Sequence, residues 1–144
     1  MRSSCSRFPN SAARRMVRGT ALALTLTIGV AALPAAALAN FQSATEAYAR
    51  GDYSAAEPEF RRLAEKGNPL AQVYLAVMYE RGQGVEQNHR HAVYWYRAAA
   101  GQGVAEAQFN LGLLYAKGFG VSRDHVTAAR YYRAAAEQGH PGAQ

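Results

Sequence analysis

Cysteine is almost missing from this sequence, because the only one, Cys5, lies near its start. Beyond that position the chain has no disulfide, no thiolate ligand for a metal and no acceptor for a lipid anchor. A domain without cysteine is compatible with an oxidising compartment but does not require one. The mature chain is therefore expected to fold without disulfides or thiolate-bound metal.

Acidic residues are absent from the first 39 positions, which carry five arginines: Arg2, Arg7, Arg14, Arg15 and Arg18. An apolar stretch from Thr20 to Leu33 follows, and Ala37-Leu38-Ala39 has the small-residue pattern of a cleavage site. This order predicts that residues 1–39 are an export signal, removed between Ala39 and Asn40. We expect the mature chain to be periplasmic or secreted.

The apolar stretch is shorter than the ~20 residues that cross a bilayer, so we expect no stable membrane insertion after cleavage. An uncleaved membrane anchor is the alternative. The pair Arg14-Arg15 suggests twin-arginine export, but the residues around it fit that motif poorly, which favours general secretion.

Excess positive charge is also missing once the leader is set aside. The whole sequence has 16 Lys and Arg against 10 Asp and Glu, a formal net charge of +6. Removing the five arginines of the leader leaves 11 basic and 10 acidic residues, a net charge of +1. A strongly basic face is the usual mark of a nucleic-acid-binding domain. The composition therefore predicts that the mature chain does not bind nucleic acid.

Internal similarity is what the sequence has in abundance. Residues 68–103 and 104–139 align without a gap over 36 positions, of which sixteen are identical. The identities include Tyr79 with Tyr115, and the run 97–100 with the run 133–136. A fixed period of this length indicates a repeat architecture.

The first half of each copy has the spacing of a helix. Ala71, Leu75, Met78 and Tyr79 recur at steps of three and four, which predicts one buried stripe. Asn68 is a suitable N-cap before Pro69, and Gly82 stands where a left-handed residue ends a helix.

The second half of each copy predicts a loop and another helix. Gly84-Val85 is too rich in glycine for a helix, and Asn88 and its equivalent Asp124 are suitable N-caps. Because neither helix can bury its stripe alone, the pairs are expected to pack antiparallel and to stack. The fold class predicted is an all-α, right-handed solenoid of helix-loop-helix units.

The two copies share the pattern A-Q-x-x-L-(A/G)-x-x-Y-x-x-G-x-G-V, then (N/D)-x-x-x-A-x-x-(W/Y)-Y-x-x-A-A-x-x-G. This pattern resembles the Sel1-like repeat, a relative of the tetratricopeptide repeat with a longer inter-helix loop. The resemblance covers residues 68–139 and implies a protein-interaction scaffold, commonly found in bacterial envelope or signalling proteins. The lack of cysteine means that nothing particular to disulfide-rich members of the group is implied.

The flanking segments are shorter versions of the same unit. Residues 40–67 are predicted to form a degenerate leading repeat, in which Gly51-Asp52-Tyr53 replaces the long loop. Pro58 predicts either a kink or a second helix that begins only near Glu57. Residues 140–144 restart the pattern. We expect the helix over 127–137 to show an apolar outer side, so that the chain is a fragment or another molecule covers that end.

Candidates for chemistry are few. The histidines are His89, His91, His125 and His140. The first two are two residues apart at a helix start and diverge, and successive repeats hold the others too far away for one metal ion. Ser122, Asp124 and His125 are adjacent in sequence, but Asp124 is better explained as a helix cap. The glycine loops lack the strand and the lysine of a phosphate-binding motif. We expect no enzyme activity, no metal and no cofactor.

The first helix of each repeat is apolar on a second side as well as along its core stripe, which is unusual for a surface helix. In the tetratricopeptide architecture that the repeats resemble, this side lines the concave groove. The predicted partner-binding residues are Val73, Tyr74, Val77, Glu80, Arg81, Phe109, Asn110, Leu113 and Lys117. These side chains form either a groove for a partner helix or peptide, or a contact between neighbouring repeats.

The function predicted from these observations is a non-enzymatic protein-protein interaction scaffold of the bacterial cell envelope. The partner is a protein or peptide bound on the concave face. Two alternatives stay open: an N-terminal fragment of a larger envelope regulator or secretion-associated protein, and a hydrolase of the Sel1-like group.

Overall fold

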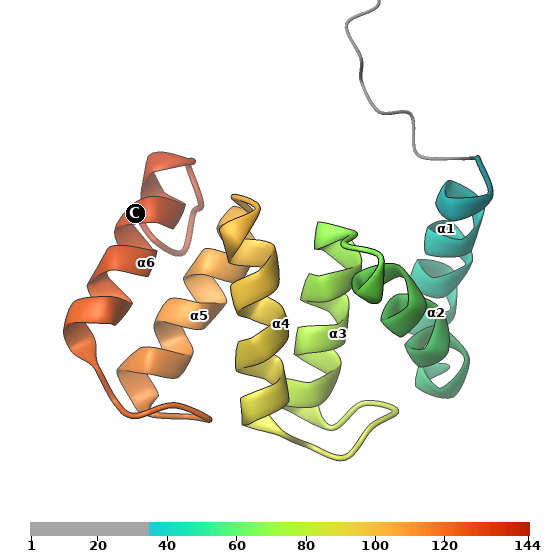
Figure 1. Ribbon diagram of the computed structural model, residues 1–144, viewed down its shortest axis with the longest axis horizontal. Coiled ribbons are helices and arrows are strands. Elements are labelled where there is room, and N and C mark those ends of the chain that lie inside the picture. The colour runs from blue at the N-terminus through green and yellow to red at the C-terminus, as the bar shows by residue number, and fades with distance from the viewer. Residues whose placement is uncertain (1–34) are drawn as a thin grey trace, which may run out of the picture. The chain divides into compact units, whose positions relative to one another are not determined.

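The computed structural model describes residues 35–144, and within this range all regular structure is helical (Figure 1). The six helices are α1 (Ala35–Ala49), α2 (Tyr53–Glu65), α3 (Pro69–Arg81), α4 (His89–Gly101), α5 (Ala105–Lys117) and α6 (His125–Glu137). Each helix packs mainly against its neighbours in sequence, which makes a row of three helical hairpins. The protein is an all-α repeat solenoid, as the sequence predicts.

The helix ends follow the capping residues. The Asn68 side chain accepts a hydrogen bond from the Ala71 N–H at 3.0 Å, and Asn88 accepts from the Arg90 and His91 N–H groups. Gly82 ends α3 in the left-handed conformation, with φ of 68°. The three predictions are confirmed. Val104, in the place of Asn68, gives α5 no side-chain cap.

The start of α2 differs from one of the two expectations for Pro58. The helix begins at Tyr53 and runs through Pro58, so a start near Glu57 is wrong. Asp52 caps it by accepting from the Ala55 N–H at 3.2 Å, and Ala56 and Phe60 are fully buried. The exposed proline removes one backbone hydrogen bond, but the cap and the burial outweigh this loss.

The predicted leader falls mostly outside the described residues. Its arginines and the apolar stretch from Thr20 to Leu33 lie there, whereas the predicted cleavage site lies in the first turns of α1. None of the helices that the structure describes has the length and apolar character that a bilayer crossing requires. The export signal remains a prediction.

The interior consists of two apolar clusters that meet at Tyr79 and Trp95. The first joins α1, α2 and α3 around Phe60, Leu75 and Met78, and the second joins α3, α4 and α5 around Tyr96 and Leu111. Each cluster draws side chains from two successive hairpins, because one hairpin is too small to enclose its own apolar stripe. The stripe predicted for residues 71–79 therefore lies in the interior.

Candidate interaction surface

The loops between helices set the spacing of the repeats. The loops 82–88 and 118–124 lie at the same edge of the row (Figure 1). A Cβ on Gly84 would lie 2.7 Å from the Tyr53 carbonyl oxygen, and a Cβ on Gly120 would overlap the His89 carbonyl oxygen. Both glycines have positive φ as well. They act as turn residues, and they also let each loop touch the backbone of the preceding hairpin.

Successive hairpins are also joined by a contact between an arginine of one hairpin and a tyrosine of the next. Arg61 donates to the Tyr79 hydroxyl at 2.9 Å, and Arg97, 36 residues later, donates to the Tyr115 hydroxyl. The guanidinium carbons of the two arginines lie over the tyrosine rings, 5.8 and 5.6 Å from the centroids. Tyr79 and Tyr115 are also 36 residues apart, so the period of the sequence appears in the structure as a repeated contact between successive hairpins.

The predicted binding residues of α3 lie at the boundary between core and surface. Val73, Tyr74 and Val77 are all partly buried. The ring of Tyr74 stacks on Phe60, with centroids 4.6 Å apart, and meets Tyr48 edge to face at 5.3 Å. Tyr74 therefore contributes much of its area to the leading hairpin, while Val73 and Val77 pack on the second cluster.

On α5 the predicted residues Phe109, Asn110 and Leu113 are also partly buried. Phe109 stacks on His140 with centroids 4.5 Å apart and contacts Tyr132 at 5.7 Å. Asn110 donates to Glu106 at 3.1 Å. Leu113 keeps part of its surface exposed, as Val77 does at the same position in α3.

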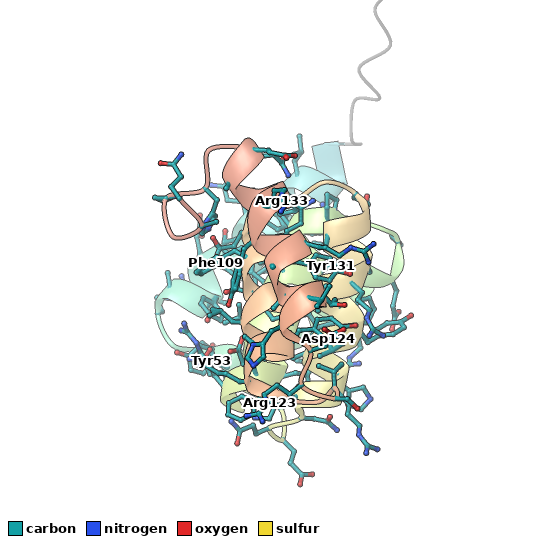
Figure 2. All side chains as sticks on the ribbon, turned by 90° about the vertical axis from the view of Figure 1, so that its left-hand side faces the viewer. Tyr53, Phe109, Arg123, Asp124, Tyr131 and Arg133 are labelled. Atoms are coloured by element: carbon teal, nitrogen blue, oxygen red, sulfur yellow. The ribbon has the colours of Figure 1, made fainter. Side chains whose placement is uncertain are left out.

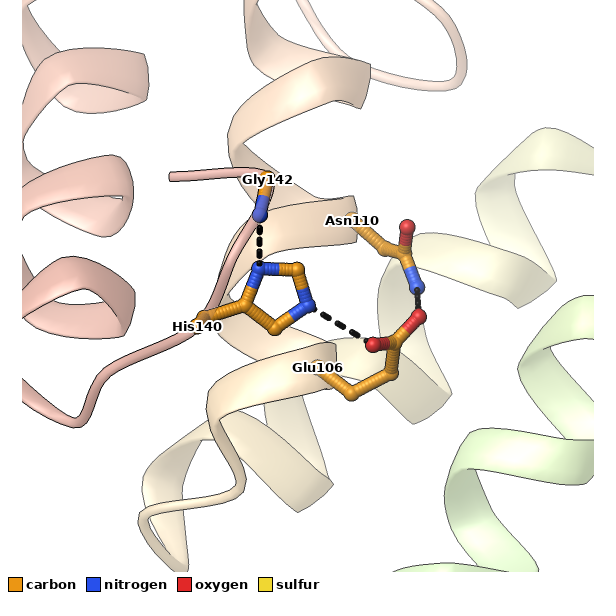
Figure 3. A network of polar contacts seen from close by, with 4 residues as sticks. All are labelled: Glu106, Asn110, His140 and Gly142. Atoms are coloured by element: carbon orange, nitrogen blue, oxygen red, sulfur yellow. Dashed lines mark hydrogen bonds and ion pairs between the residues drawn. The ribbon is translucent and has the colours of Figure 1, made fainter. Parts of the chain in front are cut away.

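Sequence reasoning missed the polar contacts around Glu106. The His140 Nε2 lies 2.8 Å from the Glu106 carboxylate, and the His140 Nδ1 accepts from the Gly142 N–H at 3.2 Å (Figure 3). The two residues are 34 positions apart, and nothing in a single repeat pairs them. This contact holds residues 140–142 against α5, beside Phe109.

The charged residues at the edge of the predicted groove behave differently from one another. Glu80 accepts a hydrogen bond from the Tyr96 hydroxyl at 2.8 Å. Burial, and to a lesser extent the Glu80 carboxylate, raises the pKa of Tyr96. Arg81 and Lys117 are exposed, and the Lys117 ammonium lies 5.8 Å from the Phe119 centroid. Glu80 is thus partly buried and held by Tyr96, while the two cations face solvent.

The residues considered for metal binding or catalysis include His89, His91 and Asp124, and these three make packing or helix-capping contacts. His89 stacks on Phe119 at 5.0 Å, and His91 lies against Tyr79 at 4.8 Å. The Asp124 carboxylate accepts from the Thr127 hydroxyl and from the N–H groups of Thr127 and Val126, which lowers its pKa. Asp124 is therefore the N-cap of α6. No group of three potential metal ligands occurs in the range 35–144.

Comparison with family models matches residues 69–104 and 105–140 to the Sel1 repeat. A search of the curated proteins found no match. A solved Sel1 repeat protein from Oxalobacter formigenes is 43% identical, with a TM-score of 0.69, over 72% of this chain and 42% of that chain.

Two other solved structures are similar. A protective antigen of uropathogenic Escherichia coli strains that displays an SLR fold is 39% identical, with a TM-score of 0.68, over 72% of this chain and 23% of that chain. Cysteine rich protein B of Helicobacter pylori has a TM-score of 0.59 at 23% identity, over 61% of this chain and 66% of that chain, a likeness of fold. The chain spans less than half the length of the first two proteins.

Proposed function

Because this chain belongs to the Sel1 repeat family, whose members are commonly protein-protein interaction scaffolds, we propose that it is a non-enzymatic scaffold of the bacterial cell envelope. It binds a protein or peptide through the concave face of its first helices. The binding residues are Val73, Tyr74, Val77, Glu80, Arg81, Phe109, Asn110, Leu113 and Lys117. The export pattern of the leader, Arg-rich and then apolar, supports the envelope location.

One observation carries the proposed surface. The equivalent side chains Val77 and Leu113 are both partly buried, so each packs into the solenoid and still offers apolar area to solvent. Because the orientation of such side chains is already fixed by the solenoid, little conformational entropy is lost when a partner covers them, which favours binding. Tyr74 and Glu80 support this frame through Phe60 and Tyr96.

The experiment compares two charged variants of the 144-residue chain in affinity capture from an envelope extract. The double variant Val77→Glu with Leu113→Glu places charge in the proposed surface, and we expect it to lose the captured partner. The control is Val126→Glu on α6, where the valine is 72% exposed and lies outside the surface. Circular dichroism establishes that both variants keep their helices.

Two results would contradict the proposal. If the folded double variant still captures the partner, the partner does not bind at the proposed surface. If Val126→Glu loses the partner equally, the loss does not depend on which face carries the added charge. Cell fractionation tests the location separately: a chain that stays uncleaved in the cytoplasm contradicts the envelope assignment without bearing on the surface.

A further inference from the structure

A hollow on another part of the molecule has the features of a second binding site. It has a volume of about 670 Å³ and lies between α4 and the loop that joins α5 to α6. Its lining residues are Arg90, Val93, Tyr94, Arg97, Ala98, Gly120 and Val121. A second hollow of about 510 Å³ shares Arg90, Gly120 and Val121 with it and extends to Gly118 and Ser122. None of these residues belongs to the proposed concave surface.

The two sites lie on different sides of the solenoid. Arg97 is bonded to Tyr115, and the ring of Tyr115 stacks on Tyr131 with centroids 5.8 Å apart. Viewed toward α6, Tyr131 and Phe109 project on opposite sides of that helix (Figure 2). Because Phe109 belongs to the concave surface, the hollow beside Arg97 is a separate feature.

The hollow carries positive charge with nothing to neutralise it. Arg90 and Arg97 make no ion pair with any described residue, and the sequence from 87 to 105 contains neither Asp nor Glu. In the leading hairpin, by contrast, Arg61 occupies the position of Arg97 and is paired with Glu57. The nearest acid of the following loop, Asp124, is occupied as the cap of α6.

Arg97 and Tyr94 each make a contact within the protein that orients their side chains toward the hollow. Arg97 donates to the Tyr115 hydroxyl, and since a guanidinium has five N–H donors, others remain for a ligand. Between the two arginines, Tyr94 is 62% exposed and rests edge to face on Trp95, with centroids 4.9 Å apart. An exposed ring between two cations can hold an apolar side chain flanked by two carboxylates.

We propose that this hollow binds an extended acidic peptide segment of a partner protein. Arg90 and Arg97 are seven residues apart on one helix, or ~10 Å along its axis. A peptide in the extended polyproline II conformation rises ~3.1 Å per residue with three residues per turn, so two carboxylates three residues apart lie on the same side of the peptide, ~9 Å apart. The side chain between them contacts Tyr94. A peptide fits better than a nucleic acid because residues 40–144 carry a net charge of only +1.

Fluorescence anisotropy with the 144-residue chain tests the proposal. The probe is a labelled, acetylated peptide with two glutamates three residues apart and a leucine between them, and its control has glutamines in their place. We expect the glutamine peptide to bind at least roughly tenfold more weakly, because it loses two charge-assisted contacts. Arg90→Glu should weaken the glutamate peptide by a similar factor.

The control variant is Arg130→Glu, which makes the same charge change on exposed α6 outside the hollow. We expect it to weaken binding by less than about threefold, the effect of a distant, screened charge. If Arg90→Glu loses its helical circular dichroism, Tyr94→Ala replaces it, since this side chain is exposed. In nuclear magnetic resonance spectra the peptide should shift the amide signals of Gly118 and Gly120 but not those of Gly51 and Gly67.

Several outcomes overturn the proposal. Equal losses in the Arg90 and Arg130 variants mean diffuse electrostatic attraction, and equal binding of both peptides means that the carboxylates are not recognised. Tighter binding of a single-stranded oligonucleotide or of phosphatidylserine vesicles assigns the hollow to that class of ligand instead. Absence of any peptide binding at millimolar concentration also rejects the site.

Discussion

The helices α4 and α6 occupy the same place in successive repeats and share the run Tyr-Arg-Ala-Ala-Ala, yet their surroundings differ. In α4 five residues are buried: Ala92, Val93, Tyr96, Ala99 and Ala100. In α6 only Ala128 and Ala135 are buried. Because α4 packs on both α3 and α5, while α6 packs mainly on α5, the difference shows that burial comes from stacking of neighbours.

Removing the shared tyrosine should break this comparison most clearly. Tyr96 is fully buried and Tyr132 only partly, so Tyr96→Ala should lower the free energy of unfolding by about 3–5 kcal/mol and Tyr132→Ala by about 1–2 kcal/mol. Urea denaturation of both variants measures the two losses. Similar losses would mean that α4 and α6 are equally supported.

The loop glycines should give the next largest difference. Gly120 lies against the His89 backbone, whereas a Cβ on Gly139 would meet nothing within 4 Å, although both have positive φ. Gly139→Ala should therefore cost only the backbone strain, about 1–2 kcal/mol, and Gly120→Ala about 1–3 kcal/mol more. Thermal unfolding of the two variants decides whether the close approach between hairpins matters.

At alkaline pH, Tyr96 and Tyr132 should ionise at different points, which compares their surroundings in the unmutated protein. Burial raises the pKa of both Tyr96 and Tyr132 above the ordinary value of 10.0, and Tyr96 also faces the Glu80 carboxylate. A raised folded-state pKa means that stability is complete below pH 10 and falls as the pH rises above it. We expect ultraviolet difference spectra to show Tyr132 ionising first and Tyr96 only with unfolding. Replacement by phenylalanine assigns each signal, and ionisation of Tyr96 in the native fold would contradict its buried environment.

Removing the helix caps should have the smallest effect on the free energy of unfolding, and it should destabilise both repeats. Asn88→Ala removes the hydrogen bonds to two backbone N–H groups and should cost about 1 kcal/mol. Asp124→Ala should destabilise α6 in the same direction, since its cap contacts are local. The urea midpoints of the two variants test this. A large loss in one repeat alone would mean that the caps act through stacking.

The sequence predicts well those features that depend on residues within one repeat. The helices, the caps at Asn68, Asn88 and Asp124, and the buried stripe of α3 follow from local spacing, because they depend on residues three or four positions apart. The start of α2 could not be predicted from local spacing. The propensity of Pro58 opposes a helix, but the burial of Phe60 stabilises it.

Contacts between repeats could not be predicted in the same way. The close approach of Gly120 to His89 and the contact of His140 with Glu106 join residues about one repeat apart, and their geometry depends on how hairpins stack. A signal existed for the first: Tyr53 and His89 are one 36-residue period apart, as are Gly84 and Gly120. The double role of Tyr74, in the core and at the surface, depends on the aromatic cluster of the leading hairpin.

Hydrogen exchange of the native 144-residue chain, followed by mass spectrometry, tests the central claim that stacking of successive hairpins creates the interior. We predict that amides in the middle of α4 exchange at least roughly tenfold more slowly than the equivalent amides of α6, because local opening is easier where fewer side chains are buried. Equal protection of the two helices would contradict the account.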